Sequence, residues 1–219
     1  LYAVMEGIRM VEQDEADYCI AGAGDASITR LMLAGYRNMG VLSKGEMRPY
    51  DKARDGFLIG EGAGIVILEK LANAKARGAH IYAAVLAHRY GFESSDAISF
   101  PPEGEGLRRC LIELLKQSKI APLEIDYFNL HGTATKQGDL YETKQIKSAF
   151  GKEAYQIPMS ATKSMTGHML GASGVVEIIT CLMAMRDSFI PPTANLKTPD
   201  PECDLDYTPQ KSKPKKVNI

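Results

Sequence analysis

The sequence predicts a layered α/β fold, because apolar segments typical of buried strands alternate with segments whose apolar residues recur at helical spacing. Residues 2–11 are predicted as the tail of a helix, and residues 16–23 as a buried strand that ends in Gly22-Ala23-Gly24. Residues 63–68 are a second buried strand, followed by a short helix that Gly78 ends. Residues 39–57 are polar and rich in turn residues, which indicates a long ordered loop.

The second half of the chain repeats this alternation. Strands are predicted over residues 81–87, 125–130 and 157–161, and helices over 104–118, 140–150 and 172–186. The last helix is apolar nearly all round, so we expect it to be buried. The two blocks join near residues 77–81, which indicates two related halves, 1–80 and 81–219.

The composition is that of an ordinary soluble globular protein, with 219 residues of which 45% are hydrophobic and 24% charged. A formal net charge of −1 gives no reason to expect nucleic acid or an anionic membrane as the main partner. The longest apolar stretch, 175–185, is too short to cross a bilayer. The lysine-rich segment 211–216 is interpreted as a solvated connector. The chain begins inside a helix, so we expect it to be part of a longer protein.

The four cysteines have no metal-binding spacing, so no metal site is predicted. Cys19 and Cys181 lie in apolar runs and are interpreted as small core residues. Cys110 follows two arginines, but no base lies near it in the sequence. We therefore expect none of the cysteines in this chain to be a nucleophile, and the pattern suits the reducing cytoplasm.

Two histidines lie at positions that are typical of active-site residues. His131 follows a predicted strand and precedes Gly132-Thr133, and open α/β folds bind ligands at the carboxyl ends of their strands. His168 follows Thr166-Gly167 and precedes the buried helix. Taken alone, each histidine could equally be a buried core residue with no part in a site. Together they can present imidazole N–H groups to one developing negative charge.

Two other segments have structural interpretations. Gly60-Glu61-Gly62-Ala63-Gly64 lacks the lysine and serine of a phosphate loop, so we expect tight packing of glycines. Residues 48–57 carry alternating charges that predict a local ion-pair network. Glu177 lies between apolar pairs on the predicted buried helix, and a buried carboxylate must be neutralised or paired.

The spacing of these residues carries a resemblance to a known family. His131-Gly-Thr, Gly138-Asp139, Lys163 five residues before His168, and Glu177 resemble the two histidine motifs of the β-ketoacyl-acyl-carrier-protein synthases. The similarity is greatest to the discrete bacterial elongating enzymes. It implies a thiolase-like αβαβα sandwich of two similar halves, incomplete at both ends here. The nucleophilic cysteine would precede Leu1, and a glycine-rich segment would follow Ile219.

The resemblance also implies roles for individual residues. His131 and His168 would stabilise an enolate by hydrogen bonding the thioester oxygen, while Lys163 pairs with Glu177 and orients His168. Asp139 would support the site. Three hydroxyls would bind the phosphopantetheine arm of the substrate: Thr133, Thr135 and Ser99.

The implied reaction is a decarboxylative Claisen condensation that lengthens an acyl thioester with malonyl-acyl-carrier protein. It needs an acyl carrier protein as partner, a homodimer as the assembled state, and no metal or organic cofactor beyond the carrier's pantetheine. Without the cysteine, we expect the 219 residues alone to be inactive in condensation.

Two rivals stay open at this stage. One is a non-condensing partner of the chain-length-factor type, although such partners usually alter the histidine motifs. The other is a thiolase, which would need a second cysteine after the Gly-His pair. Chain-length preference and the choice between a fatty acid and a polyketide pathway are not readable from the sequence.

Overall fold

The computed structural model describes residues 1–93 and 104–219. In chain order its helices and strands are α1 (Tyr2–Glu12), β1 (Tyr18–Asp25), α2 (Arg30–Asn38), β2 (Gly62–Glu69), α3 (Leu71–Ala76), α4 (Gly106–Ser118), β3 (Phe128–Asn129), α5 (Lys136–Phe150), β4 (Met159–Ser160), α6 (Lys163–Thr166), α7 (Ser173–Asp187), β5 (Phe189–Ile190) and β6 (Lys213–Pro214). Three 3₁₀ turns add η1 (Pro122–Glu124), η2 (Gly151–Gln156) and η3 (Leu170–Ala172). The predicted α/β alternation is confirmed.

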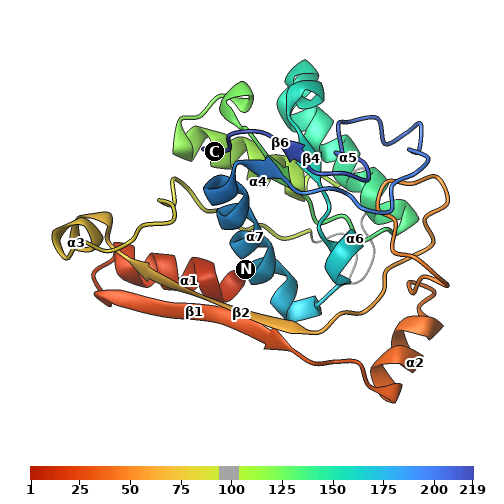
Figure 1. The fold of residues 1–219 in the computed structure, drawn as a ribbon, viewed down its shortest axis with the longest axis horizontal. Helices are drawn as coiled ribbons and strands as arrows, with labels where there is room; N and C mark the ends of the chain where they lie inside the picture. The colour runs from red at the N-terminus through yellow and green to blue at the C-terminus, as the bar shows by residue number, and fades with distance from the viewer. Residues whose placement is uncertain (94–103) are drawn as a thin grey trace.

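Helix α7 occupies the middle of the molecule. It lies between the sheet of β1 and β2, which α1 also covers, and the part of the fold that contains α4, α5 and β4 (Figure 1). The helix was expected to be buried, and it is so in part: Ser173, Val175 and Ala184 are buried, and the other residues from 174 to 185 are partly buried. The helix packs on β2 where Gly64 meets Val175 and Ile179.

Strands β1 and β2 pair antiparallel over their whole length. They were expected to be buried, and that expectation is wrong for one face of the sheet. Helices α1 and α7 both pack on the face that carries Ala21 and Val66. The outward-facing Ile20, Ile65 and Ile67 are each 66–67% exposed, because no element in the described residues covers that face.

Two further expectations need correction. Residues 81–87 form no strand, because they pair with no strand in the described parts of the chain, and Val85 and Leu86 are exposed. Pairing is a tertiary property, so an apolar extended segment without a neighbour does not become a strand. Helix α2 was not predicted. The side chain of Thr29 caps it by accepting the N–H of Met32 at 3.3 Å.

The second half has its own core between α4, α5, β3 and β4. Its fully buried side chains include Leu130, Ile146, Ile157 and Met159. Strands β3 and β4 pair in parallel, so their carboxyl ends reach the same edge. The chain leaves β3 through Leu130 into His131, and leaves β4 into α6 and Lys163. The fold therefore brings two of the predicted site residues to one place.

Candidate active site

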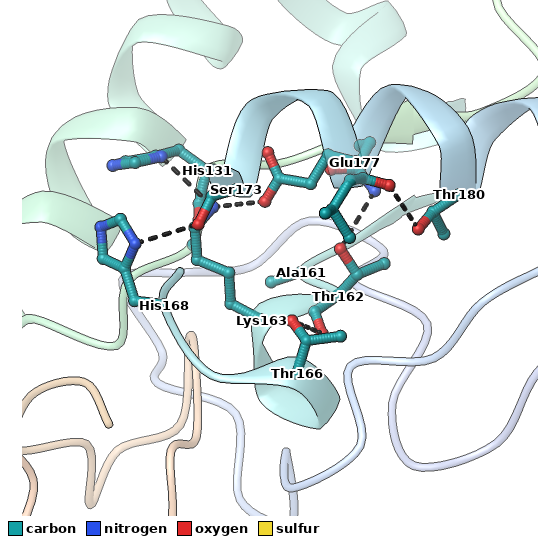
Figure 2. A network of polar contacts seen from close by, with 12 residues as sticks. His131, Ala161, Thr162, Lys163, Thr166, His168, Ser173, Glu177 and Thr180 are labelled. Carbon is teal, nitrogen blue, oxygen red and sulfur yellow. Dashed lines mark hydrogen bonds and ion pairs between the residues drawn. The ribbon is translucent and has the colours of Figure 1, made fainter. Parts of the chain in front are cut away.

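Three separate segments carry the groups that meet at this edge. His131 comes from the turn after β3, Lys163 and His168 from α6 and the turn that follows it, and Glu177 from the second turn of α7 (Figure 2). The sequence analysis assigned all four to one site, and the structure brings their side chains together.

Lys163 is the centre of this cluster, with a side chain that is only 1% exposed. Its ammonium forms an ion pair with the Glu177 carboxylate, donates to the backbone carbonyl of His131 at 2.7 Å and lies 3.4 Å from His131 Nδ1. Burial raises the pKa of Glu177, and the lysine opposes that rise. The pairing expected for Glu177 is therefore present. Apart from Glu177, the Lys163 ammonium bonds to His131, whereas the expectation was that it orients His168.

His168 is held by its own set of contacts. Its backbone N–H donates to Leu58 at 2.7 Å, and its carbonyl accepts from Gly60 at 3.0 Å. The ring nitrogen Nδ1 accepts the N–H of Leu170 at 3.1 Å and lies 3.1 Å from the Ser173 hydroxyl, which Figure 2 shows. These contacts fix both the position and the orientation of the imidazole.

The hydrogen-bond partners also determine which tautomer each ring adopts. An ammonium and a backbone N–H can only donate, so Nδ1 is the acceptor on both rings and the proton resides on Nε2. The ring centroids of His131 and His168 are 5.6 Å apart with planes at 88°. Two N–H donors at this separation can both reach one oxygen atom.

Both imidazoles are neutral at physiological pH. Burial, with the charge of Lys163 second, lowers the pKa of His131 from 6.5 to about 3. Burial followed by Lys163 and then His131 lowers the pKa of His168 to about 3. His131 is exposed to solvent, which limits the effect of burial on its pKa, whereas His168 is half-buried. A neutral imidazole can donate its N–H without losing the proton, as an oxyanion site requires.

An open cleft of about 1390 Å³ leads to His131. Thr133 and Thr135 line it, and their hydroxyl oxygens lie 3.1 Å apart. Its rim carries basic residues that include Arg37, Lys44 and Lys136. The two predicted hydroxyls therefore share a cleft with the histidine. Ser99, the third, lies outside the described residues.

Asp139, the other predicted supporting residue, is fully buried on α5. Its carboxylate accepts the N–H groups of Tyr50 at 2.8 Å and Ala134 at 3.0 Å, and lies 3.6 Å from the Arg54 guanidinium. Burial raises the pKa of Asp139 to about 7, while the donors and Arg54 oppose the rise. Asp139 therefore acts on the turn that carries the histidine and threonines.

Glu142 is a site residue that the sequence analysis missed. Its carboxylate accepts the backbone N–H groups of His131 at 2.8 Å and Gly132 at 2.9 Å. The sequence did contain a signal for Glu142. It lies three residues after Asp139, which was already predicted to support the site, and residues three apart lie on the same face of a helix.

The glycine-rich segment packs as expected, but the local ion-pair network predicted for segment 48–57 is wrong, because its Arg54 pairs with Asp139 and Asp200 far away in the sequence. Asp51 accepts the N–H groups of Lys197 and Thr198 at 2.9 and 2.7 Å. The buried Arg54 bonds Asp200 at 2.6 Å, so segment 48–57 ties distant loops together. A Cβ on Gly60 would lie 2.4 Å from the Thr166 carbonyl oxygen, so the glycine permits close packing beside His168.

The remaining chemistry-bearing residues lie elsewhere. None of the four cysteines lines the cleft, and burial raises the thiol pKa of Cys181 to about 12 and raises that of Cys203. Cys181 is half-buried beside a core cluster, and Cys203 is fully buried. Within residues 1–93 and 104–219, no group of three or more His, Cys, Asp or Glu side chains is arranged to hold a metal ion. None of the helices in that part of the chain is both long and apolar enough to cross a bilayer.

Comparison with known proteins agrees with the expected family. Residues 1–74 match the N-terminal domain of the beta-ketoacyl synthases and residues 82–197 match their C-terminal domain. The chain is 42% identical over 223 residues to 3-oxoacyl-[acyl-carrier-protein] synthase 2 of Synechocystis, covering 99% of this chain and 54% of that protein. It thus spans about half the length of such relatives.

Solved structures of the same family share the fold. One is a ketosynthase of a type II polyketide synthase in complex with its acyl-carrier protein (TM-score 0.92, 35% identity, covering 98% of this chain and 54% of that one). Another is the ishigamide ketosynthase/chain length factor (TM-score 0.90, 36% identity, covering 99% and 52%). The expected thiolase-like fold class is confirmed. By sequence, by fold and by the arrangement of its two histidine motifs, this chain belongs to the β-ketoacyl synthase family.

Proposed function

We propose that this protein catalyses the decarboxylative condensation of an acyl thioester with malonyl-acyl-carrier protein, which gives 3-oxoacyl-acyl-carrier protein. The observation that carries the proposal is the pair of neutral imidazoles, each with its Nδ1 occupied and its Nε2–H free to donate. Two such donors stabilise the enolate oxygen that develops when the malonyl thioester loses carbon dioxide. The enolate carbon then attacks the acyl group on a nucleophile and releases the lengthened product.

The start of α1 lies where a nucleophile that precedes Leu1 would suit this reaction. Leu1, where α1 begins, packs so closely on Gly174 in the first turn of α7 that a methyl group on Gly174 would come within 2.5 Å of Leu1 Cγ. Glu177, which pairs with Lys163, lies one turn further along α7. A cysteine that precedes Leu1 would therefore emerge beside the histidines, at the N-terminus of a helix that favours its thiolate.

The cleft suits a substrate on a phosphopantetheine arm. Thr133 and Thr135 offer hydroxyls along its wall, and the basic rim would attract an acidic carrier protein. We infer an acyl carrier protein as partner and a homodimer as the working state. Light scattering of the protein in its natural form would measure whether it is a dimer.

The decisive experiment measures malonyl-carrier decarboxylation by the protein in its natural form, with His131→Ala, His168→Ala and the control His80→Ala. His80 contacts the ring of Tyr82, and we assign it no part in the site. Loss of either site donor should reduce the rate by about a hundredfold or more, while the control should keep it. Rates that stay unchanged in both site variants would contradict the proposal.

A second candidate is a non-condensing partner of the chain-length-factor type, because the name of one similar structure includes a chain length factor beside a ketosynthase. Intact mass after incubation with a long-chain acyl-carrier protein separates the two. An acyl adduct on a cysteine that precedes Leu1 supports the condensing enzyme. Decarboxylation without any adduct supports the partner.

A further inference from the structure

The carboxylate of Glu142 joins two segments that are far apart in the sequence. One oxygen accepts the N–H of His131 at 2.8 Å, and the other accepts the N–H of Gly132 at 2.9 Å and the hydroxyl of Tyr50 at 2.7 Å. Glu142 is 8% exposed and Tyr50 is fully buried. Three donors therefore converge on one buried negative charge.

These hydrogen bonds act where the backbone needs support. The turn after β3 has positive φ at Gly132 (+43°) and at Ala134 (+61°), a conformation that disfavours a residue with a Cβ. The N–H groups of His131 and Gly132 would be unpaired without an acceptor. Bonds to a carboxylate are stronger than those between neutral groups, so Glu142 fixes the backbone from which the His131 ring projects.

We propose that Glu142 and Tyr50 form a positioning pair, in which the Tyr50 hydroxyl holds the Glu142 carboxylate and the carboxylate holds His131. This inference rests on the proposed function, because it assigns the pair to the step in which His131 donates to the enolate oxygen. Neither residue need touch the substrate. Both act through the orientation of the imidazole, whose Nδ1 lies 3.4 Å from the Lys163 ammonium.

The chain offers a matched control for the hydroxyl. The rings of Tyr50 and Tyr207 stack with centroids 3.9 Å apart and planes at 5°. Tyr207 is 2% exposed, and its hydroxyl lies 2.8 Å from that of Thr143. Tyr50→Phe and Tyr207→Phe therefore each remove one buried hydroxyl from the same stack. Only the first removes a partner of Glu142.

The test compares Tyr50→Phe, Tyr207→Phe and Glu142→Gln in the protein as its cell makes it. The readouts are kcat and KM for malonyl-carrier decarboxylation, Tm, and the imidazole ¹⁵N signals of His131. In Glu142→Gln an amide NH₂ faces a backbone donor, so kcat should fall by about a hundredfold. Tyr50→Phe should lower kcat by about tenfold with KM unchanged. Tyr207→Phe should lower Tm by no more than Tyr50→Phe does, because its hydroxyl bonds a neutral group, and should leave kcat within about twofold.

The His131 signals give a readout that does not depend on turnover. They should shift in Tyr50→Phe and stay in place in Tyr207→Phe. Equal kcat values together with equal ring signals in the two variants would overturn the inference, even if Glu142→Gln does not fold. A parent protein that does not decarboxylate malonyl thioesters would overturn the proposed function instead, and the ring signals would then decide the positioning role alone.

Discussion

Replacement of Lys163 by methionine removes a buried charge while it keeps an unbranched side chain of similar length. The Glu177 carboxylate then stays in a site that is only 16% exposed, without its counter-ion. His131 loses the donor to its carbonyl and the charge beside its Nδ1. The variant therefore perturbs stability and the histidine by two separate routes.

The size of both effects follows from the structure. Removal of one partner from a buried ion pair costs about 3–5 kcal/mol, and each kcal/mol lowers Tm by about 2–4 °C in a chain of this length. We therefore expect a fall in Tm of about 6–20 °C, toward the lower end because Glu177 keeps some contact with solvent. Without Lys163 the pKa of His131 rises and its tautomer is no longer fixed, so decarboxylation should fall by about a hundredfold.

The double variant Lys163→Met/Glu177→Gln separates the two routes, because a neutral amide needs no counter-ion. It should regain most of the lost Tm but not the decarboxylation rate. Recovery of both would mean that the lysine serves only as the counter-ion of Glu177. A single variant with unchanged Tm would refute the reasoning about the buried charge.

Three further outcomes are expected. Burial lowers the pKa of His131 and His168 from 6.5 to about 3, so between these values the unfolded chain binds more protons and the free energy of unfolding rises with pH. Solvent around His131 reduces this slope, and Asp139, whose pKa is raised to about 7, gives the opposite slope over the same window. The histidine contribution is therefore the difference between the protein and its His131→Ala/His168→Ala variant, and an unchanged pH dependence of the urea midpoint in that variant would contradict the assignment. Gly132→Ala combines a positive φ with a Cβ that would lie 2.3 Å from that of Ala161, whereas Gly40→Ala has a positive φ and open space around it. In urea unfolding, Gly40→Ala should lower the free energy of unfolding by about 1–2 kcal/mol. Gly132→Ala should lower it by a further amount of about 1–3 kcal/mol. Equal losses in the two variants would show that the contact with Ala161 relaxes freely. The 219 residues by themselves should form no 3-oxoacyl product with acyl- and malonyl-carrier proteins, and detection of that product by mass spectrometry would refute this.

Helical periodicity located the longer helices well. The α5 and α7 predictions agree with the structure to within a few residues, because apolar spacing and a terminal glycine or charge are local signals. The strands were predicted less accurately than the helices. Residues 81–87 have the composition of a strand but no partner in the described residues, and only the pairing of Tyr18–Asp25 with Gly62–Glu69 shows which face of each strand is covered.

The sequence by itself determined which residues carry the chemistry, because histidine, lysine and glutamate at fixed spacings in turns beside apolar runs have few structural uses. It also determined the α/β class and the family. The tertiary structure decided which of these groups touch. Lys163 bonds to His131 because the parallel pairing of β3 and β4 delivers both residues to one sheet edge. Glu142 joins the site because the first turns of α5 face the histidine turn. A contact between segments that are separate in the chain produces no periodic pattern in the sequence, so only the fold reveals it.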